Sequence, residues 1–424
     1  MRKFAEFNLK LLARWTLNKY KPIIIGITGS VGKTSTKDAV YSVLRNFKRV
    51  RAARENFNSE LGLLLTILGE WKNYEQRLFG LELKAGENKG KKTLFLLKVF
   101  SLSVLRLIFA KKSGYPEILI LEYGADRPGD IKNLVNIAKP DIGIITAIGK
   151  IPAHVGYYSN IESVAREKRR LIEDLSTSSY AILNADEKLV LDMKSKTRAK
   201  IMSFGFDKSA SIKISNFGAR MDKDTPIGVS FKLEYETSFV PIKIDKCFGR
   251  QISYASSAAA CVAVIFGINL VRVAESLIFH QSPKHRMRIL KGINSSIIID
   301  DSYNASPLSM RAAVDTIKEI KAKRKVAILG DMLELGEYSV AAHEKLGKEV
   351  AQTFDFLVTI GAHARLIREA AGRVGLNKKN ILSFDSVDES IKTIENLVKK
   401  GDLILIKASR GVGLDKIADI IKKT

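Results

Sequence analysis

Apolar runs and amphipathic stretches alternate along most of this chain. From residue 117 onward, the apolar runs EILILEYGA, DIGIITAIG and YAILNA are separated by DIKNLVNIA and IESVAREKRRLIEDL, whose apolar residues recur at helical spacing. A short apolar run predicts a buried strand, and helical spacing predicts a helix with one face against a core. Strands that alternate with helices are typical of a parallel sheet covered by helices. The pattern therefore predicts an α/β protein.

A change in this pattern marks the end of a first, central domain, which we place at residues 21–282. Residues 201–247 lose the helical segments and read as short strands such as VSFKLEY and SFVPIKI. We expect these strands to extend the first sheet in antiparallel fashion. The small apolar residues that follow predict a helix over 249–270, and Ser282-Pro283 separates it from what comes next.

The remaining residues, 283–424, repeat the strand and helix alternation. A strand pair, RMRILK and SSIIID, precedes a helix opened by Ser306-Pro307, since proline is well placed in a first helical turn. The strands KVAILG, FLVTIG and LILI follow, with helices predicted over 339–353 and 362–375 and a last helix at the end. This rhythm predicts a doubly wound, Rossmann-like domain.

Two further segments are amphipathic and basic. Residues 1–20 combine apolar residues at helical spacing with lysine and arginine, and have no uninterrupted apolar core of the kind that a secretory signal needs. We expect a helix that either docks on its own protein or lies on a membrane surface. A glycine- and lysine-rich insert at about 80–112 contains an apolar stretch interrupted by Lys98 and Arg106. It is short for a bilayer span, which favours an interfacial or partner-docking helix.

The charge balance is strongly basic, with 70 Lys+Arg against 45 Asp+Glu and a net charge of +25. This excess suits nucleic acid, an anionic membrane or a phosphorylated substrate, but it equally suits a solvated surface with no partner. No basic and aromatic residues interleave as a stacking platform would require, so no nucleic acid is expected. Two cysteines, Cys247 and Cys261, are too few for a disulfide framework or a zinc site and indicate a reducing compartment. The sequence does not indicate an oligomeric state.

The sequence IIIGITGSVGKTST, residues 23–36, predicts a strand, a phosphate-binding loop and the start of a helix. Glycines permit the turns by which backbone N–H groups converge, and the lysine adds a mobile cation. The helix start favours an anion at the same place. The strict Walker pattern needs a glycine at position 27, where this chain has Ile27, so the loop is a variant. Its predicted ligands are Gly29, Ser30, Gly32, Lys33, Thr34 and Ser35.

Candidate catalytic groups follow the strands of the central domain. Glu122 ends a strand and can hold a magnesium ion that the Thr34 hydroxyl also contacts. His154 follows the next strand, and the phosphate loop in the same domain favours a metal or phosphate role over a structural one. Lys168 lies in a predicted helix and, taken alone, reads as a surface lysine.

Polar residues also follow the strands of the second domain. Asp300-Asp301 and Asn304 come after one isoleucine run, Asp331 after the next strand, and Lys407 with Ser409 and Arg410 after the last. Because the carboxyl ends of parallel strands share one edge, we expect these groups to converge. A phosphate loop that faces polar strand ends of another domain is typical of an enzyme that closes over ATP and a second substrate.

Several segments together resemble the Mur ligase family. They are GITGSVGKTST, ENFNSELGLLLTIL, LEYGADRPGDI, the lone His154 before GYYSNIESVAREK, DDSYNASPLSM, LGDMLELGE and LIKASRG, in family order from about Lys21 to the C-terminus. The DDSYNASP and LGDMLELGE segments are similar to the member that joins D-alanyl-D-alanine to UDP-N-acetylmuramoyl-tripeptide. Folate polyglutamylating and cyanophycin-type ligases resemble the loop region but lack these two segments.

The resemblance implies a role for each matching position. ATP would be bound by the loop residues above, with nucleotide contacts from Asn304, Asp331 and Arg288 or its neighbour Arg286. Two magnesium ions would be held by Thr34, Glu122, His154 and a carbamylated Lys168. Lys33, His154 and Lys168 would then be the catalytic set. Substrate contacts would come from Asn56, Asn58, Lys407, Ser409 and Arg410.

The implied chemistry is acyl activation: a substrate carboxylate takes the γ-phosphoryl group of ATP, and an amine then displaces phosphate. Positioning and charge stabilisation supply most of the rate in such reactions, so no nucleophilic side chain is needed. The partners implied are a muramoyl peptide and a dipeptide, in the cytoplasm. Alternatives are a Mur-type ligase for another carboxylate or a lipid-linked muramoyl substrate, a nucleic-acid-dependent ATPase, and a non-catalytic cell-wall scaffold.

The chain departs from the family pattern in three places. Its first strand begins at Ile23, so we expect it to lack the N-terminal domain that grips the uridine-diphospho sugar. After Gly249, Gln251 and Ser253 stand where the family carries a His-Asn pair. The insert at 80–112 is the third departure. We hypothesise that the N-terminal helix and the insert replace the missing domain, by capping the site or by contacting the cytoplasmic membrane face.

Overall fold

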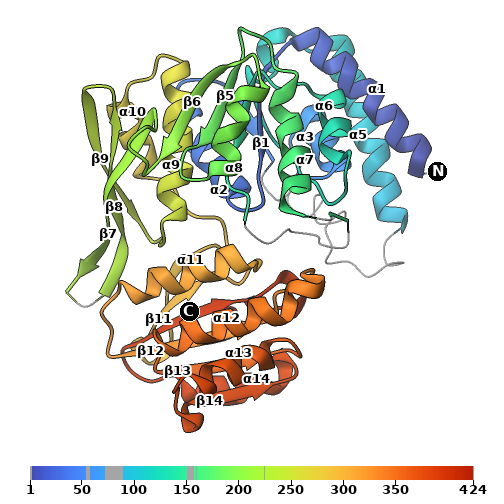
Figure 1. The fold of residues 1–424 in the computed structure, drawn as a ribbon. Helices are drawn as coiled ribbons and strands as arrows, with labels where there is room; N and C mark the ends of the chain where they lie inside the picture. Colours follow the sequence, from blue (N-terminus) through green and yellow to red (C-terminus); the bar gives the residue numbers. More distant parts are fainter. Residues whose placement is uncertain are drawn as a thin grey trace.

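The computed structural model describes residues 2–53, 58–71, 89–149, 157–158, 160–223 and 225–423, with backbone alone for residues 2–5 and 89. Two sheets organise these residues, one in the first 245 residues and one in the C-terminal part (Figure 1). The predicted α/β fold, with a mostly parallel first sheet and a second doubly wound unit, is confirmed.

Among the described residues, the first sheet has nine strands. Neighbouring strands from β2 to β7 pair in parallel, and β7, β8 and β9 pair antiparallel. The antiparallel extension predicted for residues 201–247 is therefore confirmed from β7 onward and wrong for β6, which pairs in parallel with both neighbours. In spatial order the strands are β2 (Val50–Ala52), β3 (Ile118–Glu122), β1 (Ile23–Thr28), β4 (Ile142–Ile145), β5 (Tyr180–Asn184), β6 (Lys200–Gly205), β7 (Ile212–Asp222), β8 (Thr225–Tyr235) and β9 (Ser238–Asp245).

Both faces of this sheet are covered because its strands are apolar on both sides. Ile24 and Leu119 pack into one core with α1, α3, α5, α6 and α7, whereas Ile25 and Ile118 pack into the other with α2, α9 and α10. The helices are α1 (Arg2–Tyr20), α2 (Lys33–Leu44), α3 (Glu60–Leu68), α5 (Lys89–Phe109), α6 (Asp130–Ile137), α7 (Ile161–Glu173), α8 (Lys188–Leu191), α9 (Gln251–Ile265) and α10 (Leu270–Leu277).

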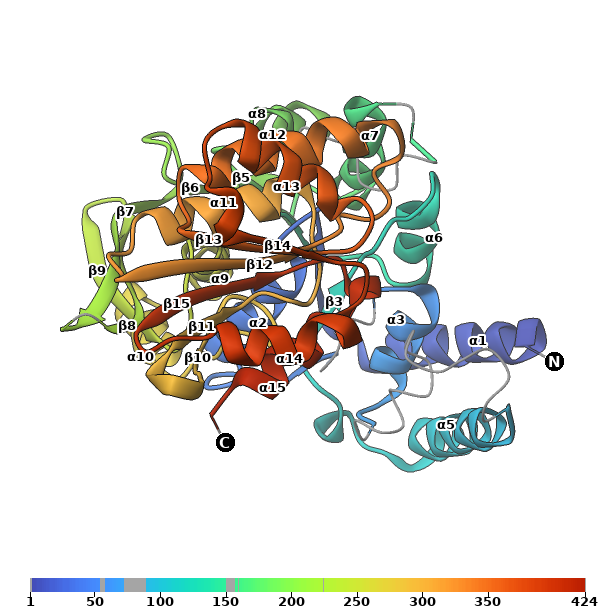
Figure 2. The ribbon, with the colours of Figure 1, turned by 90° about the horizontal axis from the view of Figure 1, so that it is seen from below.

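The second sheet has six strands in the described part of the chain, of which only β10 pairs antiparallel. Helices α11, α12 and α13 cover one face, and α14 and α15 cover the other (Figure 2). In spatial order the strands are β10 (Arg288–Lys291), β11 (Ile297–Asp300), β15 (Asp402–Lys407), β12 (Arg324–Gly330), β13 (Phe356–Ile360) and β14 (Ile381–Phe384). The helices are α11 (Pro307–Lys318), α12 (Ser339–Ala351), α13 (Ala364–Arg373), α14 (Val387–Leu397) and α15 (Asp415–Ile421).

The predicted helix over 249–270 is wrong in one respect, because two helices occupy this region. Helix α9 ends at Ile265, and Gly267 follows with a φ of +72° that favours glycine. Asn269 then begins α10 by accepting a hydrogen bond from Arg272 N at 3.0 Å. Strand β14 and helix α14 were not among the predicted elements.

The two amphipathic segments both contain helices, α1 and α5, and these lie side by side (Figures 1 and 2). Lys19 Nζ donates to Leu107 O at 2.5 Å. This contact is favourable because the carboxyl end of α5 carries partial negative charge and attracts a cation. Tyr20 Oη donates to Arg106 O at 2.8 Å, and its ring stacks on Tyr115. Both helices therefore dock on the protein along one side, as one alternative for residues 1–20 predicted.

Candidate active site

The phosphate loop is held by the end of strand β4. Ser30 N donates to Ala147 O at 2.7 Å, and Thr146 Oγ1 donates to Val31 O at 2.6 Å. A Cβ at Gly29 would lie 2.0 Å from Thr146 Oγ1, so only glycine fits there. Gly32 has a φ of +91° and turns the chain into α2. The loop is thus fixed by a neighbouring strand as well as by its own sequence.

The amino end of α2 presents backbone N–H groups. The first bond of the helix runs from Thr36 N to Gly32 O at 2.9 Å, so the backbone amides from Lys33 to Ser35 point out of the amino end of the helix. Lys33 Nζ lies over the loop, 2.6 Å from Gly29 O. Burial lowers the pKa of Lys33. Convergent amides beside a cation form an anion site.

Glu122, at the end of β3, lies against the first turn of α2. Thr34 Oγ1 is 3.3 Å from its Oε2 and Lys37 Nζ is 3.2 Å from its Oε1. All three side chains are buried. Within the described part of the chain, Oε1 accepts no hydrogen bond despite its burial, and Lys37 reaches it only as an ion pair. A buried carboxylate with an unsatisfied oxygen beside a hydroxyl fits a hard cation such as Mg²⁺.

Lys168 is buried, contrary to the surface position that its sequence alone suggests. It lies on α7 and is 4% exposed. Burial, and to a lesser extent the charge of Lys33, lowers the pKa of Lys168 to about 7. Its neighbour Glu167 accepts hydrogen bonds from Gly129 N and Ile131 N, at 2.9 and 2.8 Å, and thereby fixes the start of α6.

A pocket lies beside these groups, between the amino ends of α3 and α6. Asn58 lies at its rim, and its carbonyl accepts a hydrogen bond from Gly124 N at 3.0 Å. Because Gly124 follows β3 by two residues, the pocket opens next to Glu122. The lining residues are Asn58, Ser59, Glu60, Gly124, Asp126, Asp130, Asn133 and Leu134.

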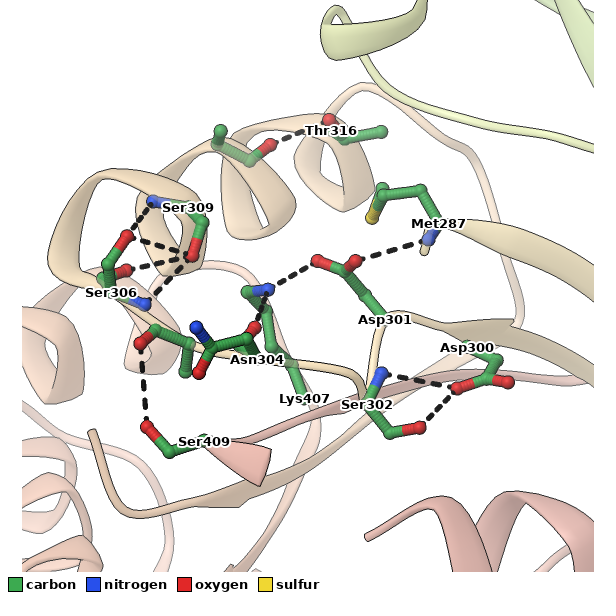
Figure 3. Close-up of polar contacts among 12 residues, drawn as sticks. Met287, Asp300, Asp301, Ser302, Asn304, Ser306, Ser309, Thr316, Lys407 and Ser409 are labelled. Carbon is green, nitrogen blue, oxygen red and sulfur yellow. Dashed lines mark hydrogen bonds and ion pairs between the residues drawn. The ribbon is translucent and has the colours of Figure 1, made fainter. Parts of the chain in front are cut away.

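The strand ends of the second sheet converge, as the sequence predicted (Figure 3). Lys407 Nζ pairs with Asp301 Oδ2 at 2.5 Å and donates to Asn304 O at 2.8 Å. Ser409 N donates to Asp331 O at 2.9 Å. Burial raises the pKa of Asp301, and Lys407 opposes that rise. The ion pair therefore fixes the loop that carries Asn304, whose side chain is exposed.

Arg286 connects this cluster with the phosphate loop. Its Nη2 lies 3.4 Å from Thr34 Oγ1, and its guanidinium stacks on Tyr303 at 4.2 Å from the ring centre. Arg410 Nη1 donates to the Tyr303 hydroxyl at 3.1 Å. Arg286 thus brings a cation from the second domain to the phosphate site of the first.

Comparisons with known proteins bear on this two-domain site. The family models described as "Mur ligase middle domain" and "Mur ligase, glutamate ligase domain" match residues 99–263 and 285–410. A Rickettsia prowazekii (strain Madrid E) protein named UDP-N-acetylmuramoyl-tripeptide--D-alanyl-D-alanine ligase is 31% identical over 418 residues, which are 97% of this chain and 80% of the relative. The chain belongs to the Mur ligase family.

Other relatives agree with this assignment. A Bacillus subtilis (strain 168) protein of the same name is 28% identical over 98% of this chain and 79% of its own length. Among solved structures, MurF ligase from Thermotoga maritima in complex with ADP has a TM-score of 0.77 at 24% identity, covering 98% of this chain and 83% of that one. This likeness shows a shared Mur ligase fold.

The structure brings several of the predicted residues together. The loop residues Gly29 to Ser35 and Glu122 lie together, and Lys168 is close enough to Lys33 for their charges to interact. His154 and Asn56 lie outside the described residues. Of the two arginines, Arg286 contacts the phosphate loop, whereas Arg288 lies in β10 opposite Asp300. Asp331 Oδ1 accepts a hydrogen bond from Ala364 N and so caps α13.

Sequence reasoning missed three residues of this site. Thr146 secures the loop, Glu167 positions the start of α6, and Lys37 pairs with Glu122. Thr146 lies inside the apolar run DIGIITAIG, where a threonine gives no signal of a role beyond the strand itself. Glu167 and Lys37 gave no signal, because lysine and glutamate on amphipathic helices are usually solvated.

Proposed function

We infer that this Mur ligase is an ATP-dependent enzyme that joins D-alanyl-D-alanine to UDP-N-acetylmuramoyl-tripeptide in peptidoglycan synthesis. Relatives of that name align with nearly the whole chain. The structural observation that supports ATP-dependent chemistry is the buried pair of Glu122 and Thr34 beside the amides of the phosphate loop. Arg286 reaches this pair from the second domain.

The residues support amide formation through an acyl phosphate. The terminal carboxylate of the tripeptide attacks the γ-phosphorus of ATP, so that a new O–P bond forms and the bond to ADP breaks. The amine of the dipeptide then attacks the acyl carbon and forms a C–N bond. Phosphate leaves as the bond between that carbon and the phosphate oxygen breaks, and the nitrogen loses a proton. Lys33 and Arg286 are placed to stabilise the phosphate charge, which is the main task in phosphoryl transfer.

Magnesium fits the oxygen groups at the loop. Thr34 and Glu122 would hold one ion, with the unsatisfied Glu122 Oε1 available as a ligand. Bound Mg²⁺ would reduce the repulsion between the phosphates and the attacking carboxylate. We assign the second ion to His154 and Lys168 on the family resemblance.

We propose that Lys168 is carbamylated. Only a neutral amine adds to CO₂; the N–C bond forms as the nitrogen loses a proton. A pKa of about 7 leaves much of Lys168 neutral at physiological pH. The product is an anion beside the cationic Lys33, so the modification would relieve the repulsion between the two lysines and supply oxygen ligands.

Substrate roles follow from position. Asn58 lies at the rim of the pocket beside Glu122, which we assign to the muramoyl peptide together with Asn56. We assign the exposed Asn304 and the Asp331 strand end to nucleotide contacts, and Lys407, Ser409 and Arg410 to the peptide end. Because Lys407 is paired with Asp301, its contribution would be to hold the loop.

Product formation tests the proposal directly. The full chain is incubated with ATP, Mg²⁺, UDP-N-acetylmuramoyl-tripeptide and D-alanyl-D-alanine, and released phosphate is compared with the UDP-linked pentapeptide measured by mass spectrometry. We expect one phosphate per product and loss of both in Lys33→Ala. Full activity of Lys33→Ala would exclude the mechanism. Turnover with folate and glutamate, or with a lipid-linked muramoyl peptide, but not with the UDP-linked substrate would establish the alternative substrates instead.

ATP and UDP-linked precursors indicate the cytoplasm as the place of reaction, and we propose that the enzyme works there at the membrane face. Among the helices of the described residues, none is long and apolar enough to cross a membrane. Contact with the membrane would therefore be peripheral.

A further inference from the structure

Helix α5 is apolar on two opposite faces, of which one is packed. Phe95, Val99 and Ser103 are buried, and the inner face lies against α1 and α3. The outer face carries large apolar side chains that are each between 50% and 76% exposed. These are Leu94, Leu97, Leu105, Ile108 and Phe109. Five such residues on one helix are more than the scattered exposure normal for a protein surface.

The five residues lie on one side of α5 and form a strip, which the exposed Lys98 interrupts between its second and third members. At about 100° per residue, all five positions lie within about 60° of a common line along the helix. From Leu94 to Phe109 the strip runs about 22 Å at about 1.5 Å per residue. Phe7 and Trp15 of the neighbouring α1 are also exposed and share one side of their helix. Both packed helices thus expose large apolar side chains.

Cations flank this strip. Residues 89–112 contain seven basic side chains and no acidic one. Lys91 is exposed near the amino end of the strip, and Lys111 and Lys112 are exposed just beyond its carboxyl end. An apolar strip with lysines at its ends favours the boundary between lipid headgroups and acyl chains, where the lysines reach phosphates.

We propose that α5, assisted by Phe7 and Trp15, binds the surface of an anionic lipid bilayer. The strip enters the headgroup region and the flanking lysines contact lipid phosphates. A second copy of this chain fits less well, because it would bring two sets of seven cations together on a protein of net charge +25. The proposal stands on α1 and α5 alone and does not depend on the ligase reaction.

Vesicle binding by the full chain tests it. Sedimentation with vesicles of phosphatidylglycerol and phosphatidylcholine is compared with pure phosphatidylcholine at low salt and at 0.15 M salt. We expect binding to the anionic vesicles that weakens with salt, and at least ~10-fold weaker binding to the neutral ones. A blue shift of tryptophan emission should accompany binding and disappear in Trp15→Phe, because Trp71 is buried.

Two variants separate insertion from simple charge attraction. Leu105→Glu/Phe109→Glu should weaken binding at least ~10-fold, and so should Lys91→Glu/Lys111→Glu/Lys112→Glu. The matched control is Ile278→Glu/Phe279→Glu, which changes similarly exposed residues after α10 and should bind as the wild type does. Circular dichroism and turnover of soluble substrate confirm that each variant is folded.

Three results would overturn the proposal. The first is no binding to anionic vesicles at low salt. The second is binding that survives Leu105→Glu/Phe109→Glu, which would mean electrostatic adhesion without insertion. The third is a dimer in sedimentation velocity that the same variant dissociates while vesicle binding is absent, which would assign the strip to a second copy.

Discussion

Glu122 illustrates how one residue can link the phosphate loop to a metal. Its buried carboxylate is held by Lys37 and Thr34, and one of its oxygens has no hydrogen-bond partner among the residues that the structure describes. Glu122→Gln keeps the shape and removes the charge. We predict that half-saturation by Mg²⁺ rises at least ~10-fold and that phosphate release falls by ~10²-fold. Magnesium titrations measure both, with the exposed Glu117→Gln as control, and an unchanged Mg²⁺ requirement would contradict the assignment.

Carbamylation of Lys168 predicts that carbamate formation depends on pH and that turnover depends on CO₂. Because burial lowers its pKa to about 7, the neutral amine becomes more abundant as pH rises through 7, and carbamate formation should increase between about pH 6 and pH 8. ¹³C NMR with labelled CO₂ should show a carbamate signal that grows over this range. Lys168→Arg should abolish the signal and lower turnover by ~10²-fold. Equal turnover in CO₂-depleted and bicarbonate-supplemented buffer would exclude a functional carbamate.

The same residues show how far a site can be predicted from sequence. Gly29, Lys33 and Thr34 were predictable because a phosphate loop is built from consecutive residues whose roles follow from their own chemistry. The burial of Lys168 was not, since it depends on how α7 packs, and the residue alone reads as a solvated lysine. Thr146 and Glu167 act through elements distant in sequence, which local patterns do not connect.

At the scale of elements, apolar periodicity predicted most strands and the antiparallel pairing of the last strands of the first sheet, which begins after β7. It missed the break between α9 and α10, because a small-residue apolar run continues across Gly267 and Asn269. It also missed β14 and α14, where the strand is only half buried and gives a weak apolar signal. The Ser386 cap before α14, which accepts from Glu389 N, was the available indication.

Helix α1 is predicted to be part of the folded core as well as a surface element. Leu12 is buried within the core formed with α3 and α5, whereas Phe7 on the same helix is exposed. Leu12→Ala should lower the free energy of unfolding by about 2–5 kcal/mol, and Phe7→Ala should change it by less than about 0.5 kcal/mol. Urea denaturation measures both. Equal effects would mean that α1 does not pack as described.

At the scale of the whole molecule, the two sheets matter together because each carries part of one charged site. The second domain reaches the phosphate loop through Arg286, which is held by Tyr303, and Tyr303 is held in turn by Arg410. Sequence patterns predicted the two domains but could not choose between Arg286 and Arg288, which lie two positions apart. Only the turn that leads into β10 decides which one faces the loop.

This arrangement predicts a difference between the two arginines. Arg286→Ala removes a cation beside Thr34 and should lower kcat/KM for ATP by ~10²-fold, as expected for one group that stabilises phosphate charge. Arg288 lies opposite Asp300 in the pairing of β10 with β11, so Arg288→Ala should lower kcat/KM for ATP less than ~5-fold. Steady-state kinetics at saturating peptide substrates provide the comparison.

Tyr303→Leu should show part of the loss of kcat/KM for ATP that Arg286→Ala shows, although the charge of the site is unchanged, because the ring that orients the guanidinium is lost. A larger loss in Arg288→Ala than in Arg286→Ala would mean that the domains meet differently during the reaction.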